Sequence, residues 1–203
     1  NKAVVETDEA SSFLPTVYTM YPIRLIAKEV APILNTAQEV IGELNANTSV
    51  TLTGIGNGYG VIEYAGKSTY VPLHHFKHVD LVMPTRDLYY EEVDYYLQVL
   101  HLLYPHFTKL ELIGQSVEGR NIHALKLGTG EQSIVLDASL HAREHMTTNV
   151  LMEMIDQYTL SFLTGGVIGS YNVHALLNEV SIWFVPMVNP DGVTLVQRGL
   201  SSI

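Results

Sequence analysis

Cysteine is absent from this 203-residue chain, and tryptophan occurs only once. Without cysteine the protein can form neither a disulfide framework nor a metal site built on thiolates. Any metal that binds must therefore be held by histidine and carboxylate side chains. The chain has nine histidines and 21 acidic residues, so such donors are available.

Basic residues are scarce: 11 Lys and Arg stand against 21 Asp and Glu, a formal charge of −10. This charge argues against nucleic acid as a partner, because its phosphates repel an acidic surface. No apolar run approaches the ~20 residues that a membrane span needs, and no signal-peptide core is present. Since the chain begins at Asn1, we expect a processed or trimmed form of a longer protein.

The first part of the chain predicts short strands separated by turns. Its strand-like segments are rich in Val, Ile, Thr and Tyr and cover residues 23–30, 39–44, 49–55, 60–66 and 67–73. Strands of this length and spacing are typical of a small all-β barrel or sandwich. Gly58 and Gly66 fall where tight hairpins need a positive φ.

The second part predicts an α/β domain. Pro84 interrupts regular structure in the connecting segment 79–87. Beyond it we expect helices over 88–105, from just after Glu144 through Leu163, and near 171–178, with strands over 109–114, 122–128, 133–139 and 180–188. The last two strands are apolar runs joined through a helix, which indicates a buried mixed or parallel sheet.

The stretch "SLHAREHM" (139–146) can be interpreted in two ways. As H-x-x-E-H it is the pattern of inverzincin-type zinc endopeptidases, with His141 and His145 as metal ligands and Glu144 as the base. As H-x-x-E it supplies two zinc ligands, His141 and Glu144, and His145 is a neighbour at the start of a helix. The first interpretation requires the whole pentad to lie within one helix.

The sequence context favours H-x-x-E. A strand is predicted to end two residues before His141, which leaves too little room for a helical turn there. His141 and Glu144 would then lie at the carboxyl end of a sheet strand, where α/β proteins place ligand sites. Asp137, inside that strand, is a candidate to orient a metal ligand from behind.

Three segments occur in an order that resembles the zinc metallocarboxypeptidases: "LIGQSVEGRNIHALKLG" (112–128), "LDASLHARE" (136–144) and "WFVPMVNPDGV" (183–193). The resemblance implies an α/β/α mixed-sheet domain, with residues 86–203 as its N-terminal part. It implies that His141 and Glu144 bind Zn²⁺ and that Arg143 lies near a peptide substrate. Residues 115–120 and 189–192 would be architectural elements bordering the site.

In that family the third zinc ligand and the base glutamate lie well downstream of the N-P-D-G segment. We therefore expect both beyond Ile203, and the chain alone to be incomplete and inactive. Arg198 is the one arginine in the final stretch, and no feature of its surroundings assigns it a role.

The first part, residues 13–78, resembles a bacterial SH3-like (SH3b) domain through "EVIGEL", "SVTL" and "GVIEYAGKSTYV". This implies a small barrel that targets cell-wall material, and a secreted or wall-associated protein. It directs the expected substrate towards peptidoglycan stem peptides, such as a γ-D-glutamyl-diamino acid bond. The alternatives are the inverzincin-type endopeptidase and a cell-wall binding protein that lacks catalysis.

Overall fold

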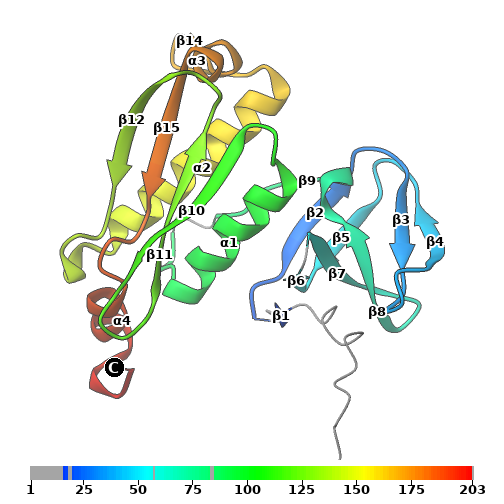
Figure 1. Ribbon diagram of the computed structural model, residues 1–203, viewed down its shortest axis with the longest axis horizontal. Coiled ribbons are helices and arrows are strands. Elements are labelled where there is room, and N and C mark those ends of the chain that lie inside the picture. The colour runs from blue at the N-terminus through cyan, green and yellow to red at the C-terminus, as the bar shows by residue number, and fades with distance from the viewer. Residues whose placement is uncertain (1–15, 18–19, 57, 83–84, 203) are drawn as a thin grey trace, which may run out of the picture. The chain divides into compact units, whose positions relative to one another are not determined.

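The computed structural model describes residues 16–17, 20–56, 58–82 and 85–202 (Figure 1). Phe13, the predicted start of the first domain, and Pro84 of the predicted connector lie outside the described residues. The chain divides into two compact units, the first ending at Val79 and the second beginning at Asp80.

The first unit is built of strands. They are β1 (Thr16–Val17), β2 (Ile23–Ala27), β3 (Ala31–Leu34), β4 (Val40–Leu44), β5 (Ser49–Leu52), β6 (Gly54–Gly56), β7 (Tyr59–Tyr64), β8 (Lys67–Pro72) and β9 (Phe76–His78), with a 3-10 turn, η2 (Leu73–His75), between the last two. Gly58 and Gly66 have φ of 83° and 73°, so the predicted positive φ is confirmed at both.

These strands form two sheets, with the orders β1-β6-β7-β8-β3-β4 and β5-β2-β9. The chain passes from one sheet to the other at Thr53, whose backbone N–H donates to Val61 O at 2.9 Å. Leu52 of one sheet packs against Gly60 of the other, where any side chain would collide with it. The prediction was a small all-β barrel or sandwich. The described strands form two sheets, because the chain changes sheet between β5 and β6, so an SH3-like barrel is not confirmed and no closed barrel is found among the described residues.

The second unit alternates helices and strands. Its elements are α1 (Tyr90–Leu103), β10 (Thr108–Gln115), β11 (Asn121–Leu127), β12 (Gln132–Asp137), η3 (Ala142–Glu144), α2 (Met146–Thr164), β13 (Val167–Ile168), β14 (Tyr171–Asn172), α3 (Val173–Glu179), β15 (Val180–Val185), α4 (Pro190–Arg198) and η4 (Leu200–Ser202). In the part of the chain that the structure describes, no helix is long and apolar enough to cross a membrane.

The main sheet of this unit has the order β10-β11-β15-β12 (Figure 1). β12 and β15 run parallel and the other neighbours antiparallel, so the predicted mixed sheet is confirmed. One face carries buried side chains, namely Leu125, Leu127, Ile182 and Phe184. Helix α1 packs on this face, where Asp94 contacts His123 of β11 at 2.6 Å.

The opposite face of the sheet is open. Its side chains, including those of Ile113, Val135 and Trp183, line an exposed hollow. β12 lies at the sheet edge, and its Ile134 and Val135 are 53% and 64% exposed. The prediction of a buried sheet is wrong at β12: among the described residues only β15 pairs with this strand, and side chains on both of its faces are exposed. The resemblance implied helices on both faces of the sheet. Among the described residues, this face has no helix on it.

Candidate metal site

The HAREH stretch is a loop followed by a single 3-10 turn. β12 ends at Asp137, and Ser139 has a left-handed φ of 52°. His141 is extended, with φ −94° and ψ 129°, before η3 covers the next three residues. Helix α2 begins only at Met146. The H-x-x-E-H interpretation required an α-helix over the whole pentad and is therefore wrong.

His141 and Glu144 share this turn. The backbone N–H of Glu144 donates to His141 O at 3.0 Å, which closes an i to i+3 ring. His141 is the residue that precedes the 3-10 turn and Glu144 is its last residue, so an imidazole and a carboxylate stand at the two ends of one short turn.

The side chains of His141, Arg143 and Glu144 are exposed. Among the described residues these three side chains have no hydrogen-bond or ion-pair partner, which leaves their polar atoms open to a ligand. Histidine and carboxylate are the donors that hydrolytic zinc sites use. The turn therefore fits two positions of a zinc site. Among the described residues, no group of three or more His, Asp or Glu side chains is placed to hold a metal.

Hydroxyl groups of three residues hold the loop before the turn. The Ser139 backbone N–H donates to Thr147 Oγ1 at 2.9 Å, and that hydroxyl donates to Glu144 O at 2.7 Å. Ser139 Oγ lies 2.6 Å from Thr148 Oγ1, which donates to Pro186 O at 2.6 Å. Ser139 and Thr148 are both almost fully buried. The exposed turn is thus attached to a rigid base.

The N-P-D-G segment (189–192), expected only as an element bordering the site, begins helix α4. Asn189 caps the helix by accepting a 2.9 Å hydrogen bond from Gly192 N, and Pro190 occupies the first helical position. Both are helix-start signals that the sequence contains. Asn189 also donates from Nδ2 to Leu140 O at 3.3 Å. A methyl group on Gly192 would lie 2.9 Å from Ala142 Cβ, so α4 meets the metal-site turn at close range.

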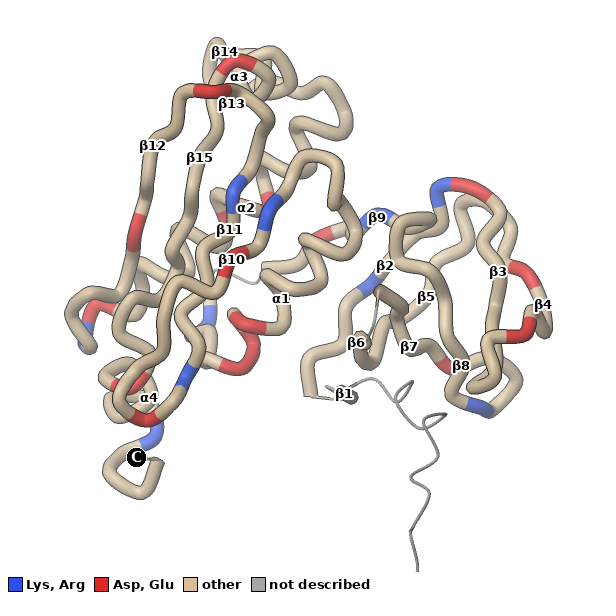
Figure 2. The backbone as a smooth tube through the Cα atoms, viewed as in Figure 1, with Lys and Arg blue, Asp and Glu red and all other residues tan. Residues whose placement is uncertain are grey.

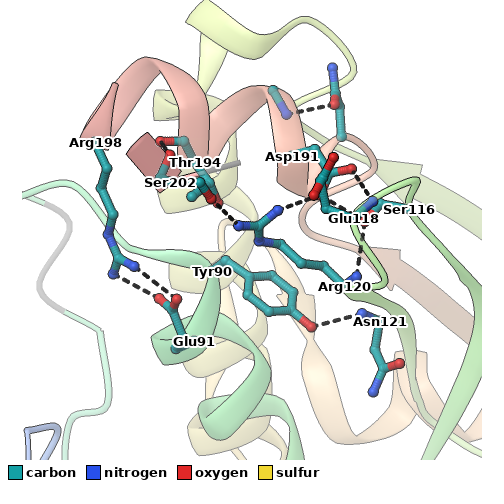
Figure 3. Close-up of polar contacts among 12 residues, drawn as sticks. Tyr90, Glu91, Ser116, Glu118, Arg120, Asn121, Asp191, Thr194, Arg198 and Ser202 are labelled. Carbon is teal, nitrogen blue, oxygen red and sulfur yellow. Dashed lines mark hydrogen bonds and ion pairs between the residues drawn. The ribbon is translucent and has the colours of Figure 1, made fainter. Parts of the chain in front are cut away.

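Asp191, in the first turn of α4, binds the loop that joins β10 to β11 (Figure 3). It accepts hydrogen bonds from Ser116 Oγ at 2.8 Å, Glu118 N at 3.0 Å and Arg120 Nη1 at 2.6 Å. Burial alone would raise the pKa of Asp191, but these three donors outweigh it and hold the pKa below its usual value. Segments 115–120 and 189–192 were both predicted to border the site, but their contact with each other was not predicted. The bonded residues are 71–75 positions apart in the sequence.

The other end of α4 is attached to α1. Arg198 makes two 2.8 Å hydrogen bonds to the carboxylate of Glu91, and its guanidinium lies over the Tyr89 ring.

Tyr90 accepts a hydrogen bond from Asn121 N, and burial raises the pKa of Tyr90 to about 12. Charged residues of both signs gather at this end of the unit (Figure 2).

Two further predicted residues lie beside the turn. His145 precedes α2, as expected, and its Nε2 is 3.2 Å from Asp87 Oδ1. Asp137 is exposed at the edge of the sheet, so the expectation that this acid is buried inside the strand is wrong. The edge position of β12 is the reason.

The family profile of the zinc carboxypeptidases matches residues 93–201, more than half of the chain. The chain is 34% identical over 96 residues to a zinc carboxypeptidase of Saccharothrix mutabilis subsp. capreolus, covering 44% of this chain and 21% of that protein. It is 36% identical over 103 residues to gamma-D-glutamyl-L-diamino acid endopeptidase 1 of Lysinibacillus sphaericus, covering 51% and 26%. The chain thus matches about a quarter of the length of these relatives.

Among solved structures, the second unit resembles thrombin-activatable fibrinolysis inhibitor, with a TM-score of 0.50 and 21% identity. The likeness covers 57% of this chain and 28% of that one. At this identity it supports the fold, which is a mixed α/β arrangement of the carboxypeptidase kind.

Proposed function

The chain belongs to the zinc carboxypeptidase family, and from this premise we propose that it supplies His141 and Glu144 as zinc ligands to a metallopeptidase. The observation that carries the proposal is the turn itself. It carries both side chains at its two ends, exposed and without a partner among the described residues, next to a loop that buried hydrogen bonds hold at Ser139. Bound zinc supplies Lewis-acid activation of water and of the peptide carbonyl.

Arg143, between the two proposed ligands, would bind the substrate. Its guanidinium is exposed and has no partner among the described residues. A guanidinium offers planar, paired donors that match a carboxylate or a peptide oxygen. We therefore assign Arg143 to orienting the peptide beside the metal rather than to the chemical step.

The third ligand and the base glutamate would come from a part of the protein outside this chain. Two observations support this. No third donor is grouped with His141 and Glu144 among the described residues. The open face of the main sheet also exposes apolar side chains such as Ile113 and Val135, as expected for a face that further structure covers.

We propose cell-wall peptides, for example a γ-D-glutamyl-diamino acid bond, as the substrate. The name of the Lysinibacillus sphaericus relative supports this choice. So does the first unit, whose two facing sheets and hairpin glycines are compatible with an SH3b-type wall-targeting domain over residues 13–78. Such a protein would work outside the cell, at the wall.

Zinc binding by the protein that contains this chain tests the proposal. Competition with a chromogenic chelator should give tight binding for the unaltered protein and a loss of more than about tenfold for His141→Ala and for Glu144→Ala. His106→Ala, at an exposed histidine outside the motif, is the matched control and should bind zinc normally. Equal zinc affinity in all four proteins would refute the assignment.

Substrate choice needs a second assay. The zinc-loaded protein should cleave a γ-D-glutamyl-diamino acid peptide faster than an α-linked peptide of the same length. A preference for the α-linked peptide would exclude the wall substrate while leaving the metal site intact. A protein that takes up no zinc and cleaves neither peptide, and whose Glu144→Ala variant still binds cell walls, would favour a binding protein without catalysis.

A further inference from the structure

Asp191 is engaged on all sides by one loop. Its three hydrogen bonds come from Ser116, Glu118 and Arg120, which all lie in the connection between β10 and β11 (Figure 3). Arg120 also donates to Ser202 O at 2.7 Å, and the backbone N–H of Arg120 donates to Ser116 Oγ at 3.0 Å. The loop and the first turn of α4 are therefore held together as one unit.

The first turn of α4 also supports the turn formed by residues 141–144, called the zinc-ligand turn below. Gly192 follows Asp191 directly and leaves room for Ala142, which lies between His141 and Arg143 in the sequence. Asn189 donates from its backbone N–H to Ser139 O at 3.2 Å and from its side chain to Leu140 O. The start of α4 is thus in contact with the backbone immediately before and within the turn.

We propose that Asp191 is a positioning residue for the zinc site, which it acts on through the start of α4. By fixing Asn189 and Gly192 against the turn, its hydrogen bonds to Ser116 and Arg120 set where the two zinc ligands stand. This inference rests on the proposed function, because it requires His141 and Glu144 to bind zinc.

The reasoning is geometric. Metal affinity depends on ligands held within a few tenths of an ångström of their binding positions, and residues behind the ligands commonly change it by 10–100-fold. The side chains of His141, Arg143 and Glu144 are exposed, so the turn is held through its backbone and through Ala142. A shift at the start of α4 would therefore pass directly to Ala142.

A matched control exists at the other end of the same helix. Glu91 of α1 pairs with Arg198, the last residue of α4, whereas Asp191 lies in the first turn of that helix. Breaking this pair should loosen α4 without moving its first turn. The comparison separates positioning from general stability.

The test compares Asp191→Asn with Glu91→Gln in the whole protein that carries this chain. Asparagine keeps the size of the side chain but replaces one acceptor oxygen with an NH2 group. That group is a donor and cannot accept the hydrogen bonds that reach Asp191. We expect Asp191→Asn to weaken Zn²⁺ binding about tenfold, measured by chelator competition. Glu91→Gln should change it less than about twofold, in line with an exposed ion pair.

Urea unfolding of both variants completes the comparison. If Asp191→Asn lowers stability yet leaves the zinc affinity unchanged, the residue only stabilises the fold and the inference is overturned. Ser116→Ala is the milder variant in case Asp191→Asn fails to fold, and it should also weaken zinc binding while Glu91→Gln does not. If the unaltered protein binds no zinc, the proposed function itself fails, a result distinct from an unchanged affinity in Asp191→Asn.

Discussion

Replacing Gly192 by alanine tests the contact between α4 and the zinc-ligand turn. In most helices this change is favourable, because alanine is about 1 kcal/mol better than glycine as a helix former. Here the new methyl group would lie 2.9 Å from Ala142 Cβ and 2.6 Å from Asn189 Nδ2. Both distances are shorter than an ordinary van der Waals contact, so one neighbour must move.

The expected balance is unfavourable. Inserting a methyl group into a packed contact costs about 1–3 kcal/mol. If the Asn189 side chain yields, the helix also loses its cap, which costs about 1 kcal/mol more. After subtracting the gain of about 1 kcal/mol in helix propensity, we expect Gly192→Ala to lower the free energy of unfolding by about 1–3 kcal/mol.

Urea unfolding, followed by the fluorescence of Trp183, measures this loss. Trp183 is the single tryptophan and lies in β15, so the signal reports the second unit. With a slope of about 2 kcal/mol per molar urea, the midpoint should fall by about 1 M.

Gly114→Ala is the matched control for the Gly192 prediction. Its methyl group would meet no atom within 4 Å, so we expect a change below about 0.5 kcal/mol. A Gly192→Ala protein as stable as the unaltered one would refute the close approach.

Three further predictions concern charged and titrating groups. Arg86→Ala should lower the free energy of unfolding by about 3 kcal/mol in the same urea assay, because it leaves the fully buried carboxylate of Glu92 without its partner. This is the low end for a broken buried pair, since Arg86 is 43% exposed. A smaller loss for Arg86→Ala than for Arg86→Lys would contradict this prediction. Because burial raises the pKa of folded Tyr90 to about 12, the contribution of Tyr90 to stability should be present below pH ~10 and be lost as the pH rises from there to about 12; Tyr90→Phe should make the alkaline decline shallower. Because the pKa of Asp191 is lowered in the fold, its contribution should be present above pH ~4 and be lost as the pH falls below that; an acid unfolding curve unchanged by Asp191→Asn would exclude it.

Much of the second unit could be predicted from the sequence. Apolar spacing placed α1, α2 and β15 within a few residues of their observed ends, and the strand-turn-helix pattern decided how to interpret HAREH. The exposure of β12 could not be predicted, because an apolar run does not reveal whether its strand has one neighbour or two. Helix α4 was missed although Asn189 and Pro190 are start signals, since N-P-D-G is equally typical of turns.

In the first unit, β3 was missed because Pro32 interrupts its apolar residues. Proline cannot donate to a neighbouring strand and argues against a central position. The structure tolerates it because β3 pairs with β8 only at Leu34 and Tyr70, so no hydrogen bond from Pro32 is required on that side. The rule that proline is excluded from central strands thus failed here, because β3 pairs with β8 over a single residue pair.

The proposed zinc ligands were easier to predict from the sequence than the residues that hold them in place, because the two kinds of residue are distributed differently along the chain. The donors of His141 and Glu144 must face solvent and stay unengaged, so they stand on one short turn and form a local motif. The groups that hold the turn must be satisfied and rigid, and they are drawn from distant segments, such as Thr148 from α2 and Asp191 from α4. Sequence motifs record the first kind of residue directly. The second kind becomes visible only when the contacts between those segments are known.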